Sequence, residues 1–129
     1  MRGCLICMKT KLMCWIATTL LLAACGAPKP IPHDCITWVN NYYIQYPVSG
    51  LSSTTGGWLF RGAKAFGSEL RVGFLIPEAM DESANKRRAI LNRICPQKFE
   101  KIWQILPYRN TLTIHVWTED KKFKDLITC

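Results

Sequence analysis

The side chains that could act as a nucleophile or a base are few in this chain. Its only histidines are His33 and His115, and beyond residue 25 its cysteines are Cys35, Cys95 and Cys129. A thiol beside an imidazole can act as an activated nucleophile, and Cys95 with His115 is the one pair to consider. No local signature marks a catalytic cysteine, and His33 lies in a proline-rich segment. The sequence therefore predicts no catalytic residue.

Metal and phosphate ligands show no clustering either. Beyond residue 24 the sequence contains neither a Cys-x-x-Cys nor a His-x-x-x-His pair, which are spacings typical of metal sites. The acidic residues Glu78, Asp81 and Glu82 precede a predicted helix, whose dipole stabilises negative charge at that end. Gly56-Gly57 lies in a loop and lacks the pattern of a phosphate-binding turn. We therefore expect no metal and no cofactor.

A basic run is the clearest surface feature. Lys86, Arg87 and Arg88 are consecutive, and Arg93 follows in the same predicted helix. A solvated helix face explains such a run most simply. The alternative is a contact with lipid headgroups, an acidic glycan or an acidic protein partner. We take these four residues as one part of a candidate interaction surface.

Aromatic residues supply the other part of that surface. Tyr42 and Tyr43 are adjacent, and Trp38 and Tyr46 lie in the same segment. Because aromatic rings with a polar tip are frequent at interfaces, we add Tyr42 and Tyr43 to the candidate interaction surface. The later tryptophans are instead predicted to belong to the core; they are Trp58, Trp103 and Trp117.

The N-terminal segment has the pattern of an export signal. Lys9 and Lys11 precede an apolar run over residues 12–24, which ends in small residues. This run is too short to cross a bilayer comfortably, since crossing needs about 20 apolar residues. The stretch from Met8 to Lys11 is already a complete basic start, so translation from Met1 and from Met8 both remain open.

The end of the apolar run, Leu22-Ala23-Ala24-Cys25, resembles the lipobox of bacterial lipoproteins. The resemblance implies that residues 1–24 are a signal peptide, that the sulfur of Cys25 is diacylated, and that the new amino group is acylated after cleavage. Two or three acyl chains anchor a protein stably. In this family an aspartate after the cysteine retains the protein at the inner membrane. Gly26 therefore implies the outer membrane and a periplasm-facing domain, with the inner membrane as the alternative.

A periplasmic location would favour disulfides among the remaining cysteines, because that compartment is oxidising. Cys129 is the last residue of the sequence, and chain ends fray unless they are tied down. We therefore predict a disulfide between Cys129 and either Cys95 or Cys35, and both pairings stay open. The third thiol is then buried or bridges to a partner chain.

The charge of the chain after cleavage is modestly positive. Loss of the leader leaves fourteen lysines and arginines against nine aspartates and glutamates, a net charge of about +5. Such a charge suits a protein near anionic lipid or acidic polysaccharide. It is too scattered to favour nucleic acid. The expected partners are the membrane, through the N-terminal lipid, and an envelope protein.

The start of the mature chain predicts a tether and then a helix. Prolines at 28, 30 and 32 favour an extended tether over residues 25–33, followed by one small domain over residues 34–129. A helix is predicted to begin at Cys35, with Asp34 as its cap and Pro47 as its end. The same stretch also alternates as a strand would, and this alternative stays open.

The rest of the domain predicts an α+β fold. Strands are expected over residues 58–60, 69–76, 111–118 and 123–128, the last two as a hairpin. Residues 61–68 carry no clear pattern. Helices are expected over residues 83–95 and 98–106, with an inward-facing set made of Ala84, Arg87, Ile90, Leu91, Ile94, Phe99, Ile102, Trp103 and Leu106. We therefore predict a small antiparallel sheet with helices packed on one face.

These observations favour a membrane-anchored envelope lipoprotein that acts as a non-enzymatic binding or assembly module, for example in a secretion or conjugation apparatus. One alternative is a small periplasmic enzyme or enzyme inhibitor. The other is a structural lipoprotein that contacts peptidoglycan or lipid.

Overall fold

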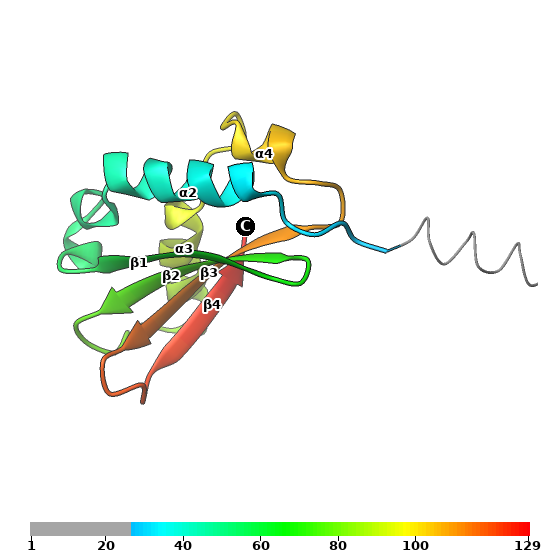
Figure 1. Cartoon of the computed structure of the whole chain (residues 1–129). Coiled ribbons are helices and arrows are strands. Elements are labelled where there is room, and N and C mark those ends of the chain that lie inside the picture. Colours follow the sequence, from blue (N-terminus) through cyan, green and yellow to red (C-terminus); the bar gives the residue numbers. More distant parts are fainter. Residues whose placement is uncertain (1–26) are drawn as a thin grey trace, which may run out of the picture.

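The computed structural model describes residues 27–129, shown in colour in Figure 1. The predicted signal peptide and the predicted acylated Cys25 lie outside these residues. In chain order the elements are α2 (His33–Gln45), the 3-10 turns η1 (Val48–Gly50) and η2 (Ser53–Thr55), β1 (Leu59–Phe66), β2 (Glu69–Ile76), α3 (Ala84–Ile94), α4 (Ile102–Ile105), β3 (Thr111–Thr118) and β4 (Lys124–Thr128).

The strands form one sheet in the order β1-β2-β3-β4, and this confirms the α+β class. The β1–β2 and β3–β4 pairs are antiparallel, as predicted, whereas β2 and β3 run parallel. The sheet is therefore mixed rather than antiparallel throughout. The physical reason is the long crossover that carries α3 and α4 between β2 and β3, since a parallel pair needs a connection long enough to return the chain.

One face of the sheet holds the core. Alternate residues of the two central strands are buried: Leu70, Val72, Phe74 and Ile76 in β2, and Leu112, Ile114 and Val116 in β3. The helices cover this face (Figure 1). Successive side chains of a strand point to opposite faces. The other half of each strand therefore points away from the helices.

Helix α2 lies across the core through residues spaced four apart, namely Cys35, Val39 and Tyr43. The structure thus decides for helix in this segment. The prediction that Asp34 caps it was wrong, because the helix already begins at His33 after Pro32, which places Asp34 inside the first turn.

Helix α3 is capped by Ser83, and its buried stripe is narrower than predicted. The hydroxyl oxygen of Ser83 accepts a hydrogen bond from the backbone N–H of Lys86 at 3.4 Å. Leu91 and Ile94 are buried, whereas Ala84 is exposed and not inward as predicted. The last two turns of α3 cover the core, and its first turn extends past it.

The predicted helix over residues 98–106 is mostly turn. Only Ile102–Ile105 is helical, and the backbone N–H of Glu100 bonds to the carbonyl of Gln97 at 2.9 Å in the preceding turn. Phe99 was predicted to face inward, but its side chain is 78% exposed because it lies on this turn rather than on a helix face. Among residues 27–129, no helix combines the length and hydropathy of a membrane-crossing segment.

Candidate functional site

The candidate site is the face of the sheet that no helix within residues 27–129 covers, which we call the open face. Its residues alternate with the core-facing ones along β2, β3 and β4, and along β1 after the bulge between Phe60 and Gly62. The set includes Lys64, Phe66, Glu69, Arg71, Gly73, Leu75, Thr113, His115, Trp117, Lys124 and Leu126.

Trp117 forms a flat platform at the centre of the open face. Its indole ring lies directly on the backbone of Gly73 in the neighbouring strand. A Cβ atom at residue 73 would lie 2.5 Å from Cη2 and 2.8 Å from Cζ3 of the indole. Only glycine leaves room for the ring to lie so close to the sheet. One side of the ring is thus packed, and Trp117 was wrongly predicted to belong to the core.

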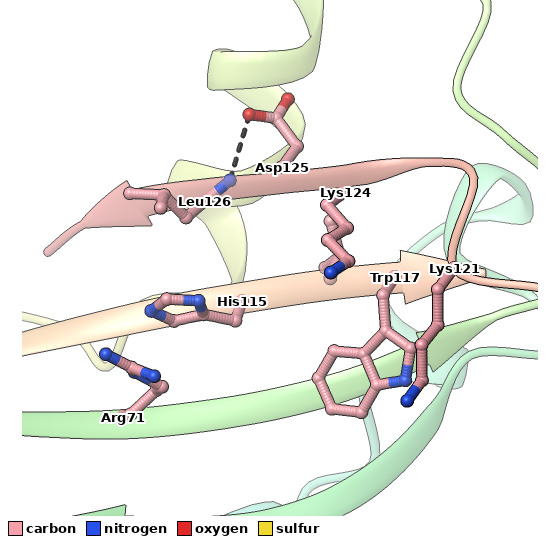
Figure 2. Close-up of a pocket in the computed structure, with 8 residues that line it drawn as sticks. Arg71, His115, Trp117, Lys121, Lys124, Asp125 and Leu126 are labelled. Atoms are coloured by element: carbon pink, nitrogen blue, oxygen red, sulfur yellow. Dashed lines mark hydrogen bonds between the residues drawn. The ribbon is translucent and has the colours of Figure 1, made fainter. Parts of the chain in front are cut away.

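Two pockets flank this platform and share Arg71, His115 and Trp117 in their walls. The first has a volume of about 480 Å³ and adds Lys121 and Lys124. Figure 2 shows both lysines close to the indole. The second has a volume of about 340 Å³, and its further lining includes Arg61, Lys64 and Phe66.

Glu69 is a carboxylate on the open face, and neighbouring side chains hold it through hydrogen bonds and an ion pair. Its carboxylate accepts hydrogen bonds from Arg71, with Nε at 3.2 Å and Nη2 at 2.9 Å, and from the hydroxyl of Thr113. The Nε2 atom of His115 lies 2.9 Å from the same carboxylate. These contacts, above all those from Arg71 and Thr113, lower the pKa of Glu69 from 4.5 to about 2. Glu69 is therefore ionised at neutral pH, and His115 donates its Nε2–H to it.

Arg71 is held in a fixed place by two partners. Besides the bidentate pair with Glu69, its guanidinium lies over the ring of Phe66, 4.0 Å from the ring centroid. The planar guanidinium group of arginine suits both contacts, because it can bond a carboxylate through two N–H groups and can also stack on an aromatic ring. Arg71 is thus positioned at the boundary between the two pockets.

Positive charge dominates the lining of both pockets. Five lysine and arginine side chains line them: Arg61, Lys64, Arg71, Lys121 and Lys124. Asp125 is the one carboxylate in that lining, and its Oδ2 atom accepts from Nε of Arg87 in α3 at 3.0 Å. The neighbouring hairpin also carries Asp120, which is engaged locally by Thr118 and Lys122. The surroundings of Trp117 therefore attract anions.

The open face presents cations, an aromatic ring and one oriented imidazole. His115 is oriented by Glu69, which is an arrangement suited to proton transfer. Among the residues that line the two pockets there is no serine, threonine or cysteine. The hydroxyl of Thr113 is buried and donates to Glu69. Within residues 27–129, no group of three or more His, Cys, Asp or Glu side chains could hold a metal ion.

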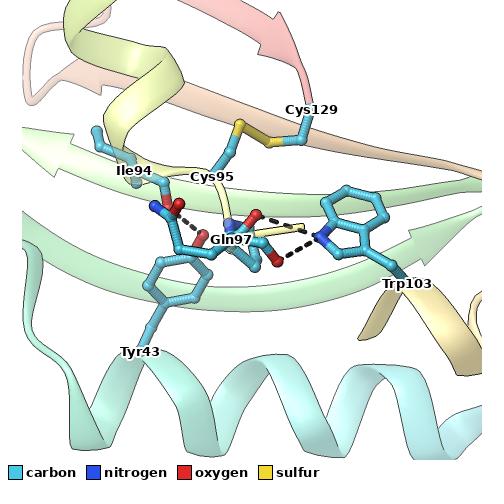
Figure 3. Close-up of a disulfide and its surroundings, with 7 residues drawn as sticks. Tyr43, Ile94, Cys95, Gln97, Trp103 and Cys129 are labelled. Atoms are coloured by element: carbon cyan, nitrogen blue, oxygen red, sulfur yellow. Dashed lines mark hydrogen bonds between the residues drawn. A yellow bond between two sulfur atoms is a disulfide. The ribbon is translucent and has the colours of Figure 1, made fainter. Parts of the chain in front are cut away.

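The cysteines settle one of the two pairings that the sequence left open. Cys95 and Cys129 form a disulfide with a Cα–Cα distance of 5.6 Å (Figure 3), so a Cys95–His115 dyad does not exist here. Cys35 is a buried free thiol, and its Sγ lies 3.5 Å from the carbonyl oxygen of Ile105. Burial raises the pKa of the Cys35 thiol.

Tyr43 is a core residue, so its place in the predicted interaction surface was wrong. Its side chain is buried, and its hydroxyl donates to the carbonyl of Ile94 at 2.7 Å, beside the disulfide (Figure 3). The reason is helical phase, because residue 43 repeats Cys35 and Val39 at intervals of four. Tyr42 is partly buried, with its ring stacked on that of Trp38 at 4.9 Å.

The predicted basic residues lie on α3, on the helix-covered side of the sheet. Lys86, Arg88 and Arg93 are exposed, whereas Arg87 is occupied by Asp125 and by the carbonyl of Glu82. Arg87 thus reaches the lining of the first pocket only through Asp125, and Lys86, Arg88 and Arg93 line neither pocket. Of the other two tryptophans, Trp58 is buried as predicted, and Trp103 is only partly buried.

The sequence does contain a signal for the open face, in the phase of its outward residues. Trp117 has the phase of Thr113 and His115 within a strand whose alternate residues are apolar. In the other central strand, one of the outward-facing positions is a glycine, Gly73, which leaves that position without a side chain. An aromatic residue in the polar phase of a strand indicates a surface platform rather than core.

Comparison of the chain with protein-family models, with curated proteins and with solved structures finds no match.

Proposed function

We propose that this protein is a lipid-anchored envelope lipoprotein that acts as a non-enzymatic binding module, with the open face as its binding surface. One observation carries the proposal. Five cations and one packed but accessible tryptophan surround two pockets on a face that no helix of the described domain covers. The lipobox-like Leu22-Ala23-Ala24-Cys25 supplies the expected location.

The way in which the side chains of the open face are held in place also supports a binding role. A solvated sheet face needs no glycine beneath a tryptophan and no buried threonine holding a carboxylate. Here Gly73 positions Trp117, and Thr113 helps Glu69 to position Arg71. Side chains that are fixed in advance lose less entropy when a ligand binds.

Two measurements test the proposal. Mass spectrometry of the N-terminal peptide should find Cys25 acylated, and Cys25→Ala should release the domain from membranes. A photo-crosslinking side chain placed at Leu126, on the open face, should give discrete adducts in intact cells, whereas the same side chain at Ile44 should not. Both positions are well exposed, at 55% and 69%, so accessibility does not decide between them. An unmodified Cys25, or equal crosslinking at the two positions, would contradict the proposal.

A further inference from the structure

The ligand chemistry of the open face follows from what flanks Trp117. We infer that the open face binds an acidic polysaccharide, with one sugar ring stacked on Trp117 and anionic groups of the neighbouring sugars paired with cations in the two pockets. This inference rests on the proposed function and specifies its ligand.

The platform fits a sugar ring. One side of the indole lies against Gly73, so the opposite side is the one that a ligand can reach. The C–H groups on one face of a pyranose pack well on an aromatic ring, whose face is electron-rich. Recognition sites of this kind combine an apolar surface with a few placed polar groups. Arg71 and His115 border both pockets and supply such groups.

The cations fit anionic groups on both sides of that ring. Lys121 and Lys124 line one pocket, while Arg61 and Lys64 line the other. Guanidinium and ammonium groups both bind carboxylates and phosphates, and guanidinium can do so in a bidentate way. A polymer that carries an acid on successive sugars would place charge in both pockets while one ring covers Trp117.

An acidic peptide fits this face less well, because peptides commonly bind a sheet by adding a strand to its edge. On each edge strand a side chain occupies one backbone N–H group. At β1 the side-chain oxygen of Asn40 accepts the backbone N–H of Ala63 at 3.1 Å. At β4 the carboxylate of Asp125 accepts the backbone N–H of Leu126 at 2.9 Å. These N–H groups are not free to pair with an incoming strand.

Single-stranded nucleic acid also fits less well. Proteins that bind it stack successive bases on several aromatic side chains. On the open face the aromatic side chains are Trp117, Phe66 and His115. The guanidinium of Arg71 already covers the ring of Phe66, and His115 is bonded to Glu69. One platform is available, which suits one stacked ring with charges on either side.

The test measures binding of the purified disulfide-bonded domain to defined oligomers by calorimetry at low and at moderate salt. The probes are an oligogalacturonate, a sulfated dextran oligomer, a neutral malto-oligosaccharide of equal length, oligo-dT and poly-glutamate. We expect the acidic sugars to bind at least about tenfold more tightly than the other three, with affinity that falls as salt rises. The first two probes separate carboxylate from sulfate-type or phosphate-type recognition.

Matched variants locate the binding. Trp117→Ala and the pair Lys121→Gln with Lys124→Gln should each weaken binding about tenfold or more. Tyr108→Ala and the pair Lys86→Gln with Lys98→Gln should not, although Tyr108 is 88% exposed and the charge removed is the same. Each variant is checked for an unchanged circular dichroism spectrum.

Three results would overturn the inference: no binding of either acidic sugar, equal binding of the neutral sugar, or tighter binding of oligo-dT or poly-glutamate. In each case, acylation of Cys25 and selective crosslinking at Leu126 would still support the proposed binding module, so the two failures are distinguishable.

Discussion

The two faces of the sheet are built from the same strands but differ in how their side chains are packed. On the helix-covered face, Phe74 contacts Tyr43 and Phe60, with ring centroids 5.2 Å and 5.6 Å apart. On the open face, one residue along, Gly73 supports Trp117, and charged groups surround it. The first face is packed for stability and the second is arranged for contact. Neighbouring residues should therefore differ sharply in what their replacement costs.

The largest expected effect is Phe74→Ala. Its side chain is fully buried, so truncation removes apolar contacts and leaves a cavity, at a cost of about 3–5 kcal/mol in the free energy of unfolding. Trp117→Ala, on the open face, should cost about 1–2 kcal/mol because only part of its surface is buried. Urea denaturation measures both. Similar losses for the two variants would show that the open face is also structural core.

Loss of the Cys95–Cys129 disulfide should rank next. The bond closes a loop across a sequence separation of 34, and chain-entropy arguments give about 3–4 kcal/mol for such a loop. The double replacement Cys95→Ser with Cys129→Ser should lower the urea midpoint accordingly and leave Cys35 unaffected. Binding to the open face should persist below the midpoint, because the bond lies on the helix-covered side. Loss of binding in a variant that is still folded would show that the open face depends on the packing of the helix-covered face.

Much of the fold was predictable because period-two alternation is a strong signal. The expected strands over residues 69–76 and 111–118 agree with β2 and β3, and the predicted hairpin is β3 with β4. β1 was predicted only over residues 58–60, because Gly62 and Gly67 interrupt its apolar pattern. A strand pattern alone does not specify the direction of its neighbour. The signal for the parallel β2–β3 pair was the predicted helical segment between the two strands, which is long enough to return the chain.

The candidate site was less predictable, for a different physical reason. Its cations come from three separate segments: Lys64 from β1, Arg71 from β2, and Lys121 with Lys124 from the β3–β4 hairpin. They meet only because β1 to β4 pair in that order. The basic run at residues 86–88 was conspicuous because it is local in sequence, yet it lies away from this face. Charge gathered by sheet pairing leaves no local trace, whereas the outward phase of Trp117 does.

Glu69→Gln should have an intermediate, pH-dependent effect. The lowered pKa, about 2, means that the unfolded chain binds more protons than the folded one between pH 2 and 4.5. Stability supplied by Glu69 is therefore fully present above pH 4.5 and lost as the pH falls towards 2. At neutral pH we expect a loss of about 1–2 kcal/mol in the variant.

The measurement for Glu69→Gln is urea denaturation from pH 2.5 to 7 of the original protein and the variant. The difference between their free energies of unfolding should shrink on acidification. Arg71→Gln serves as the partner variant, since the same pair is removed from its other side. A difference that stays constant with pH would mean that the carboxylate charge contributes nothing to stability.

The smallest expected change in stability, and the sharpest test of the comparison, is Gly73→Ala. A methyl group there would lie within 2.5 Å of the indole of Trp117, so the ring must move away from the sheet. Because that ring is partly exposed and can rotate outward, we expect a loss of less than about 1 kcal/mol. Gly73 has no positive φ, so backbone strain adds nothing. The platform should nevertheless be displaced, and binding of the acidic oligosaccharide should weaken severalfold.

Gly50→Ala is the matched control, since nothing lies within 4 Å of a Cβ atom at residue 50 and its φ is ordinary. The nuclear magnetic resonance shift of the Trp117 indole N–H should change in Gly73→Ala and not in Gly50→Ala. In the Trp117→Ala background, Gly73→Ala should have no further effect on binding, because the two replacements act on the same contact. Additive losses in the double variant would place the ligand on Gly73 itself rather than on the ring above it, and the role assigned to Trp117 would be wrong.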